Sequence, residues 1–130
     1  MRLLRTDRIQ LIEAFGDNVP PYAILSHTWG EGEVLFQDLQ HPGLESLTWD
    51  TLDDASLQSH LPPAARIALR KAGFKKIQNV ARLARRNDHH FIWVDTCCID
   101  KTNSAELLEA VSAMCRYYQK AEVCYAYHGD

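Results

Sequence analysis

Three short, largely apolar runs constrain the fold of this chain more than any other feature of its sequence. They cover residues 22–26, 91–97 and 123–127, and Pro20-Pro21 stands close before the first run. Continuous apolarity, in place of strict alternation, is typical of strands that are covered on both faces, as in a parallel sheet. Prolines do not fit the middle of a helix, so the pair marks a stiff entry to the first strand. The runs therefore predict three parallel strands.

Helical patterns occupy the intervals between these runs. Over residues 74–84, apolar residues recur at helix spacing, with lysine and arginine on the opposite side. A second helix is predicted over about 104–119, with an N-cap at Asn103. Its predicted apolar stripe comprises Leu107, Val111, Met114 and Tyr118. The order strand, helix, strand, helix, strand predicts right-handed crossovers and an α/β domain in which helices flank a parallel sheet.

The remaining segments are less regular but fit within the same domain. Residues 1–19 are predicted to form a small hairpin, with residues 2–4 and 9–12 as its strands. Residues 40–65, rich in proline, aspartate and serine, are predicted to form a long loop with a short helix. A length of 130 residues suits one domain, so residues 20–130 are expected to form a single α/β core.

Composition and cysteine usage indicate a cytoplasmic protein without a membrane span. No apolar run approaches the ~18 residues of a membrane-spanning helix, and the charged N-terminus lacks the apolar core of a signal peptide. The cysteines lack C-x-x-C spacing and lie in segments that are expected to be buried, which favours a reduced chain over a disulfide framework. These residues are Cys97, Cys98, Cys115 and Cys124.

Charge is segregated along the chain. Residues 66–86 carry eight lysines and arginines and no acid, whereas residues 31–54 are acidic. The favoured interpretation is a solvated helix face beside an acidic loop. The alternative is a basic face for a phosphate-bearing ligand or a partner domain. Nucleic acid is not an expected partner, because the basic segment lacks interleaved aromatic residues and the net charge of the chain is −3.

Polar side chains follow the first two predicted strands. Residues 26–33 come at the end of the first strand, and residues 95–103 at the end of the second. Because ligands of open parallel sheets bind at the carboxyl ends of the strands, these segments are expected to form a site. If the two strands are neighbours, one cleft would be lined by Ser26, His27, Trp29, Asp95, Asp100 and Glu106.

At these segments the chain resembles the heterokaryon-incompatibility (HET) domains of filamentous fungi. The resemblance is carried in order and at family spacing by residues 21–30, 33–39, 91–101, 104–107 and 117–121. It implies an effector of non-self recognition that triggers programmed cell death. It also implies self-association, or association with other domains of the HET or Toll/interleukin-receptor (TIR) type. The family pattern continues past the third strand into a Trp-Thr-Leu-Gln-Glu-Leu-like segment, so a C-terminally truncated domain is expected here.

HET domains are in turn similar to TIR domains, which have a flavodoxin-like sheet, and some TIR domains hydrolyse NAD+. This resemblance implies the same fold and leaves a second function open, an NAD+ glycohydrolase that releases nicotinamide and ADP-ribose products. NAD+ would be a substrate, and no cofactor is expected. Glu106 corresponds to the essential glutamate of the enzymatic members, with Glu109 as the alternative. Such a carboxylate would stabilise positive charge that develops on the ribose.

Each candidate residue also has a purely structural interpretation. Glu106 stands three residues after Asn103 and would complete a capping box by bonding to the backbone of that residue. His27 and Trp29 would bind a nucleotide. In the structural interpretation, His27 caps a strand end and Trp29 buries its ring against the long loop. The neighbouring glycines favour close approach of the backbone.

The two aspartates are candidates for binding ribose hydroxyls. For Asp100 a role in the turn before the second helix is favoured. Asp95 lies in an apolar run, where a buried carboxylate needs a partner. A nucleophilic pairing of His27 with Cys97-Cys98 lacks a third, orienting group and is disfavoured. A metal site is also disfavoured, because adjacent histidines or cysteines on an extended strand point to opposite faces.

Overall fold

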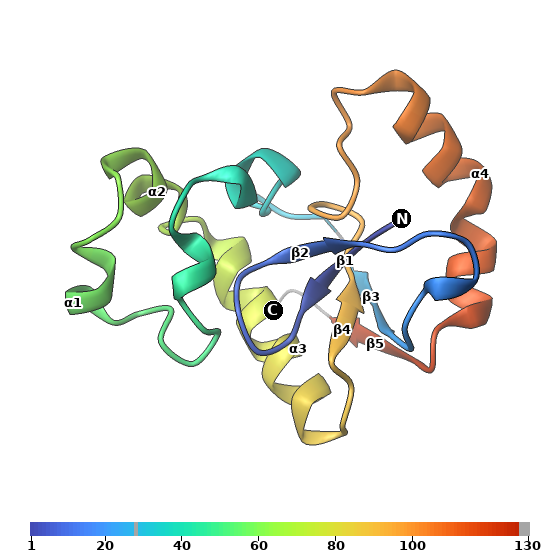
Figure 1. Cartoon of the computed structure of the whole chain (residues 1–130), viewed down its shortest axis with the longest axis horizontal. Helices are drawn as coiled ribbons and strands as arrows, with labels where there is room; N and C mark the ends of the chain where they lie inside the picture. Colours follow the sequence, from blue (N-terminus) through green and yellow to red (C-terminus); the bar gives the residue numbers. More distant parts are fainter. Residues whose placement is uncertain (28, 128–130) are drawn as a thin grey trace.

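A mixed sheet in the order β2-β1-β4-β3-β5 organises the fold in our computed structural model, which describes residues 1–27 and 29–127 (Figure 1). Thr28 of the loop after the first strand, and residues 128–130 of the expected core, lie outside the described residues. The strands are β1 (Arg2–Arg5), β2 (Leu11–Glu13), β3 (Ala23–His27), β4 (Phe91–Trp93) and β5 (Val123–Tyr127). β3 pairs in parallel with both β4 and β5, which confirms the α/β class and the parallel arrangement of the three predicted strands.

The N-terminal hairpin extends this sheet beyond β4, a pairing that the sequence did not predict. β1 and β2 pair antiparallel over the segment for which a hairpin was expected, and β1 also pairs antiparallel with β4. The sheet is therefore mixed: the three predicted strands form its parallel part, and the N-terminal hairpin adds an antiparallel part at the β4 edge. Leu3 and Leu4 are fully buried in β1, one on each face of the sheet, so their burial favours the docking of the hairpin beside β4.

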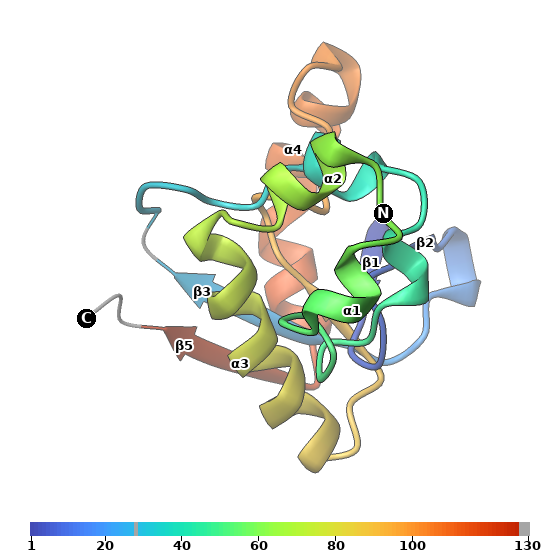
Figure 2. The ribbon, with the colours of Figure 1, turned by 90° about the vertical axis from the view of Figure 1, so that its left-hand side faces the viewer.

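Two long helices cover opposite faces of the sheet. α3 (Ala72–Arg86) leads from β3 to β4, and α4 (Ser104–Lys120) leads from β4 to β5. Figure 2 shows α3 in front of the sheet and α4 behind it. Because β3 lies between β4 and β5, the chain moves first to one side of β3 and then to the other. The carboxyl ends of β3 and β4 therefore form a topological switch point, the place where open α/β sheets bind ligands.

The segment between β3 and α3 forms a second layer over α3. It contains the short elements η2 (Phe36–Gln40), η3 (Leu44–Ser46), α1 (Ala55–Gln58) and α2 (Pro63–Ala68). A further short element, η1 (Gly16–Asn18), precedes β3. Trp49 anchors this layer, since its ring is fully buried 6.4 Å from Phe74 and its indole Nε1 donates to the carbonyl of Arg5 at 2.9 Å. The Gln78 amide in turn donates to the Trp49 carbonyl at 2.6 Å.

The charges that are segregated in the sequence pair across this layer. Lys71 binds Asp38 at 2.7 Å, and Arg82 binds Asp50 at 2.9 Å. Lys76, discussed below, binds an acid of the same segment. Several cations of the basic helix are thus engaged by the acidic segment, which leaves them less available to a phosphate-bearing ligand. No helix in the described part of the chain is long and apolar enough to cross a membrane.

The predicted apolar stripe of α4 was wrong in its orientation. The residues of this helix that are fully buried are Ala110 and Ala113. Val111 is 58% exposed and Tyr118 is 38% exposed, whereas Leu107 and Met114 are half-buried against the core. The helix approaches the sheet through its small residues, which allow closer packing than the larger residues that define the stripe in the sequence.

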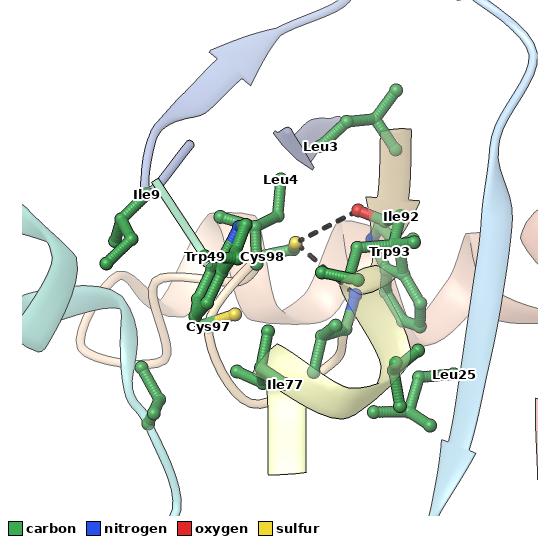
Figure 3. Packing of buried hydrophobic residues seen from close by; sticks show 14 of the residues in the cluster. Leu3, Leu4, Ile9, Leu25, Trp49, Ile77, Ile92, Trp93, Cys97 and Cys98 are labelled. Atoms are coloured by element: carbon green, nitrogen blue, oxygen red, sulfur yellow. Dashed lines mark hydrogen bonds between the residues drawn. The ribbon is translucent and has the colours of Figure 1, made fainter. Parts of the chain in front are cut away.

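The cysteines divide into a buried and an exposed pair. Cys97 and Cys98 lie in the core beside Ile92, where the Cys98 sulfur accepts from the Val94 N–H at 3.3 Å (Figure 3). Cys115 and Cys124 are exposed, so the prediction that all of these thiols are buried was wrong for this pair. Both lie on elements with little cover, α4 and the edge strand β5.

Candidate functional site

The loop after β3 and the turn after β4 bring polar side chains together at the switch point. His27 ends β3, and Asp95 follows β4 directly after Val94. The Asp95 carboxylate lies 2.9 Å from His27 Nε2 and accepts from Trp29 Nε1 at 3.0 Å. Three of the residues that the sequence predicts for the site, His27, Trp29 and Asp95, are therefore in direct contact.

These bonds keep Asp95 ionised although it is half-buried. Burial taken alone would raise the pKa of its carboxyl. The hydrogen bonds from His27 and Trp29, with the positive charge of Lys101, outweigh burial and hold that pKa below its ordinary value. Asp95, an acid within an apolar run, therefore has the hydrogen-bond and charge partners that a buried carboxylate needs.

The second ring nitrogen of His27 fixes the tautomer of its imidazole. Lys76 Nζ lies 3.1 Å from His27 Nδ1, and an ammonium group has protons to donate but no lone pair to accept with. Nδ1 is therefore the acceptor, and the proton on the ring belongs to Nε2, which donates it to Asp95. The His27 side chain is 1% exposed, so this ring is held from both sides within the protein.

A buried ion pair secures the loop that carries Trp29. Glu33 accepts from Lys76 Nζ at 2.7 and 2.9 Å and from the Gly30 N–H at 2.7 Å. The same loop is tied to the start of α3, because the Gly73 N–H donates to the Gly32 carbonyl at 2.8 Å. The approach is close enough that a Cβ on Gly73 would lie 2.6 Å from the backbone nitrogen of Val34.

Lys101 completes the group from the turn after β4. Its ammonium lies 4.3 Å from the centre of the Trp29 ring and donates to the carbonyl of Asp95. Burial lowers the pKa of Lys101, while the nearby Asp95 carboxylate opposes that shift. Trp29 itself is 48% exposed, so part of its ring faces solvent. We call the six residues His27, Trp29, Glu33, Lys76, Asp95 and Lys101 the switch-point cluster.

Sequence reasoning did not identify three members of this cluster. Glu33 and Lys101 lie in the segments after the strands, so their position was a usable signal. Lys76 gave no local signal, because in the sequence it is one of several cations on the outer side of a helix. Its contact with His27 spans 49 residues and depends on the packing of α3 against β3.

Ser26 lies outside the cluster. Neighbouring residues of a strand point to opposite faces of the sheet, so Ser26 and His27 diverge. Ser26 contacts Tyr118 of α4. Burial raises the pKa of the Tyr118 hydroxyl, and the hydrogen bond with Ser26 partly opposes this rise. The Ser26 side chain thus lies on the α4 side of the sheet.

Glu106 belongs to a separate group at the start of α4. Its carboxylate forms an ion pair with the guanidinium of Arg2 on β1 and accepts from the Asp100 N–H at 3.2 Å. Asn103 caps the helix as predicted, accepting from the Glu106 N–H at 3.1 Å. The predicted capping box is only half formed, because the Glu106 carboxylate binds Asp100 and Arg2 in place of the Asn103 backbone.

A pocket of about 370 Å³ lies beside this ion pair. Arg2, Glu106 and the alternative candidate Glu109 line it, together with the rings of Trp93 and Tyr117. The residues of the switch-point cluster are not among its walls. The candidate catalytic glutamates and the candidate binding residues therefore face different spaces.

Asp100 forms a turn, which is the favoured structural interpretation. Its Oδ1 accepts from the Thr102 hydroxyl at 2.6 Å and the Thr102 N–H at 3.1 Å. The bond from the Thr102 hydroxyl is the main cause that lowers the pKa of this exposed carboxyl. The expected grouping of six residues in one cleft is thus not what the structure shows. Their side chains divide among the switch-point cluster, the Tyr118 contact, the Asp100 turn and the Arg2–Glu106 pair.

Cys97 is unsuited to nucleophilic catalysis. A hydrogen bond with Cys98 and complete burial raise the pKa of the Cys97 thiol well above its ordinary value. A thiol that resists ionisation is a poor nucleophile. Across residues 1–27 and 29–127, no three His, Cys, Asp or Glu side chains lie close enough together to hold a metal ion.

Comparisons with known proteins are consistent with the motifs at these strand ends. Residues 22–130 match the sequence family described as heterokaryon incompatibility protein (HET). The chain is 40% identical over 134 residues to the vegetative incompatibility protein HET-E-1 of Podospora anserina. That match covers 100% of this chain and 8% of the length of the relative. No solved structure matches the chain, and the similarity to TIR domains stays a prediction.

Proposed function

The chain belongs to the heterokaryon incompatibility family, and on that premise we propose that it is an effector domain of fungal non-self recognition. In this proposal it acts in the cytoplasm and triggers programmed cell death through self-association or association with related domains. The name of the Podospora anserina relative, a vegetative incompatibility protein, supports the biological role. The relative is far longer than the matched segment. In this proposal, other parts of such proteins sense the signal that activates the domain.

The state of Glu106 is the observation that favours association over catalysis. Its carboxylate is neutralised by Arg2 and accepts from the Asp100 N–H. These bonds join the start of α4 to β1 and to the turn after β4, which is a structural task. A carboxylate that stabilises an oxocarbenium-like transition state must face the sugar, whereas the Glu106 carboxylate is engaged by Arg2.

The switch-point cluster favours a second candidate function, an NAD+ glycohydrolase. Trp29 would stack on a ring of NAD+, and Asp95 would bind ribose hydroxyls at the position where α/β sheets bind nucleotides. Glu106, after its release from Arg2, would supply the catalytic carboxylate, or Glu109 on the same pocket would supply it. Association of several copies would have to bring the two groups of residues together. NAD+ is a substrate in this scheme, and the proposal includes no cofactor.

Paired substitutions of the ion pair separate these functions. Glu106→Gln and Arg2→Gln break the same contact, but only the first removes the carboxylate. If the domain acts by association, both variants lose a similar and small amount of stability and both still kill cells that express them. If it acts by catalysis, Arg2→Gln kills while Glu106→Gln spares the cells. Viability of fungal cells expressing each variant at matched levels gives the readout.

Consumption of NAD+ by the purified chain provides the biochemical test. The parent and Glu106→Gln are compared at high concentration and when clustered on a support, with folding checked by circular dichroism. We expect no turnover by either protein. Release of nicotinamide by the parent and not by Glu106→Gln would establish the enzyme and overturn the association proposal as the sole cause of death.

A further inference from the structure

Three aromatic side chains line the pocket beside the Arg2–Glu106 pair. The rings of Trp93 and Tyr117 lie with their centroids 5.4 Å apart, and Phe15, which is 68% exposed, stands at the edge of the pocket. Its volume of about 370 Å³ is at the lower end of the range for small-molecule sites. The pocket therefore has room for a small ligand with an apolar body.

Trp93 offers this pocket an unused hydrogen-bond donor. The indole N–H groups of Trp29 and Trp49 donate to Asp95 and Arg5, whereas no acceptor in the described part of the chain bonds to that of Trp93. Trp93 is only 1% exposed, and the N–H of a buried tryptophan usually has a partner. Its Nε1 is not one of the fully enclosed atoms that lack a partner, so it belongs to the small area that the ring still exposes. Because the ring lines the pocket, a ligand oxygen there can accept from this N–H.

Glu109 offers the pocket an unpaired carboxylate. Burial and then the charge of Glu109 raise the pKa of the Tyr117 hydroxyl, an effect that Arg116 opposes, so the carboxylate lies near that ring. Among the residues that the structure describes, no cation forms an ion pair with Glu109, whereas Glu106 is paired with Arg2. A carboxylate beside aromatic rings favours an organic cation as the ligand, since both attract positive charge.

We propose that this pocket binds a small amine that carries a carbonyl group. The ammonium group of the ligand binds Glu109 beside the Tyr117 ring, and its carbonyl oxygen accepts from Trp93 Nε1. An apolar body packs against Phe15 and Ile99. Because the rings of Trp93 and Tyr117 are close together, the amine and the carbonyl of the ligand are separated by only a few bonds. The inference does not rest on the proposed association or on NAD+ hydrolysis, because neither assigns an amine to the pocket.

The charges around the pocket define the ligand further. Glu13 and Glu106 share the guanidinium of Arg2, and Glu109 adds another carboxylate to the walls. A ligand carboxylate would meet this excess of negative charge, so a free amino acid is a poor fit. An amino-acid amide, or the free amino-terminal residue of a peptide, presents an ammonium group and an uncharged carbonyl. These two sources share the chemistry that the pocket recognises.

Titration of the purified chain with leucine amide tests the site, at a pH below the ordinary pKa of the amine. We expect saturable binding with a dissociation constant of about 1 mM, as measured by calorimetry. The indole N–H resonance of Trp93 should shift in the nitrogen–proton NMR spectrum. The probe 4-methylpentanamide lacks only the amine, and 3-methylbutylamine lacks only the amide. Each should bind at least about 10-fold more weakly. An absence of saturable binding, equal binding of 4-methylpentanamide, or an unmoved Trp93 resonance would overturn the proposal.

Substitution of the carboxylate tests the assignment to Glu109. Glu109 is exposed on α4, so Glu109→Gln should fold like the parent and bind leucine amide about 10-fold more weakly. Glu45→Gln is the matched control, because Glu45 is also exposed but lies outside this pocket. Trp93→Phe removes the donor and identifies the indole resonance. Leucine amide that binds Glu109→Gln as tightly as it binds the parent would contradict the site.

Two peptides distinguish the sources of the amine. A short peptide with leucine at its free amino terminus should bind like leucine amide, and the same peptide acetylated at that terminus should not. Binding of leucine amide alone would assign the pocket to free small amines. Equal binding of the acetylated peptide would overturn recognition of the amine. Because all of these readouts measure binding, their failure would leave the proposed role in cell death to its own tests.

Discussion

The two long helices have similar lengths but opposite relations to the rest of the molecule. α3 buries seven of its 15 residues, whereas α4 buries two of its 17. α3 lies between the sheet and the layer built from the segment after β3, and Figure 2 shows α1 and α2 close to it. α4 is covered by the sheet on one side and exposes its apolar residues on the other. An apolar stripe becomes core only where a second layer meets it.

This difference assigns separate tasks to the two sides of the sheet. The α3 side holds the buried rings of Trp49 and Phe74 and positions the loop that carries Trp29. The α4 side carries the Arg2–Glu106 pair and the exposed side chains of Leu108 and Val111. We therefore expect substitutions on the α3 side to change the free energy of unfolding most. Substitutions on the exposed face of α4 are expected to change it least.

The sharpest test of this comparison is truncation of a large side chain on each helix. Phe74 of α3 is 1% exposed and packs against Trp49, so Phe74→Ala should lower the free energy of unfolding by about 3–5 kcal/mol. Leu108→Ala on α4 should change it by less than about 0.5 kcal/mol. Urea denaturation followed by circular dichroism gives both values at a concentration where the chain is monomeric. Equal losses would show that α4 is as deeply packed as α3.

The next test concerns the contact between α3 and the Trp29 loop. Gly73→Ala places a methyl group 2.7 Å from the Gly32 carbonyl and should cost about 1–3 kcal/mol. Gly30→Ala in the same loop is the control, since its added Cβ would lie 4.0 Å from Glu33, an ordinary contact. Gly73→Ala should also increase proteolytic cleavage of the loop. A neutral Gly73→Ala would mean that the loop is not held against α3.

The smallest expected effect is at the switch-point cluster, and it depends on pH. Because the pKa of Asp95 is lowered in the folded chain, the stabilisation it provides is present above its ordinary pKa. That stabilisation is lost as the pH falls through the lowered value. Asp95→Asn should cost about 1 kcal/mol at pH 7, and the difference from the parent should shrink in acid. Urea denaturation at pH 7 and pH 3 measures this. The exposed Asp17→Asn serves as the control, and a difference that grows in acid would contradict the assignment.

Local patterns in the sequence predicted much of the fold. The apolar runs predicted β3, β4 and β5, and the periodicity over residues 74–84 predicted α3, because both signals arise from neighbouring residues alone. Asn103 was recognisable as an N-cap for the same reason. The convergence of His27, Trp29 and Asp95 also followed, since parallel neighbouring strands place their carboxyl ends at one edge of the sheet.

The rest depended on contacts between distant segments. The orientation of α4 could not be read from its stripe, because Ala110 and Ala113 fit the sheet more closely than larger residues do. Burial of Cys115 and Cys124 was mispredicted because apolar character does not show whether a covering layer exists. Glu106 has the spacing of a capping box, yet Arg2 lies 104 residues away and competes with that local bond.

The sequence by itself determined the α/β class, the parallel core strands, the two long helices and the polar segments at the strand ends. These follow from periodicity and from the chemistry of neighbouring residues, which act over a few positions of the chain. The tertiary structure decided which side chains meet. It placed Lys76 on His27, Arg2 on Glu106 and the N-terminal hairpin on β4. Such partnerships are selected by burial and by neutralisation of charge in three dimensions, and no local pattern records them.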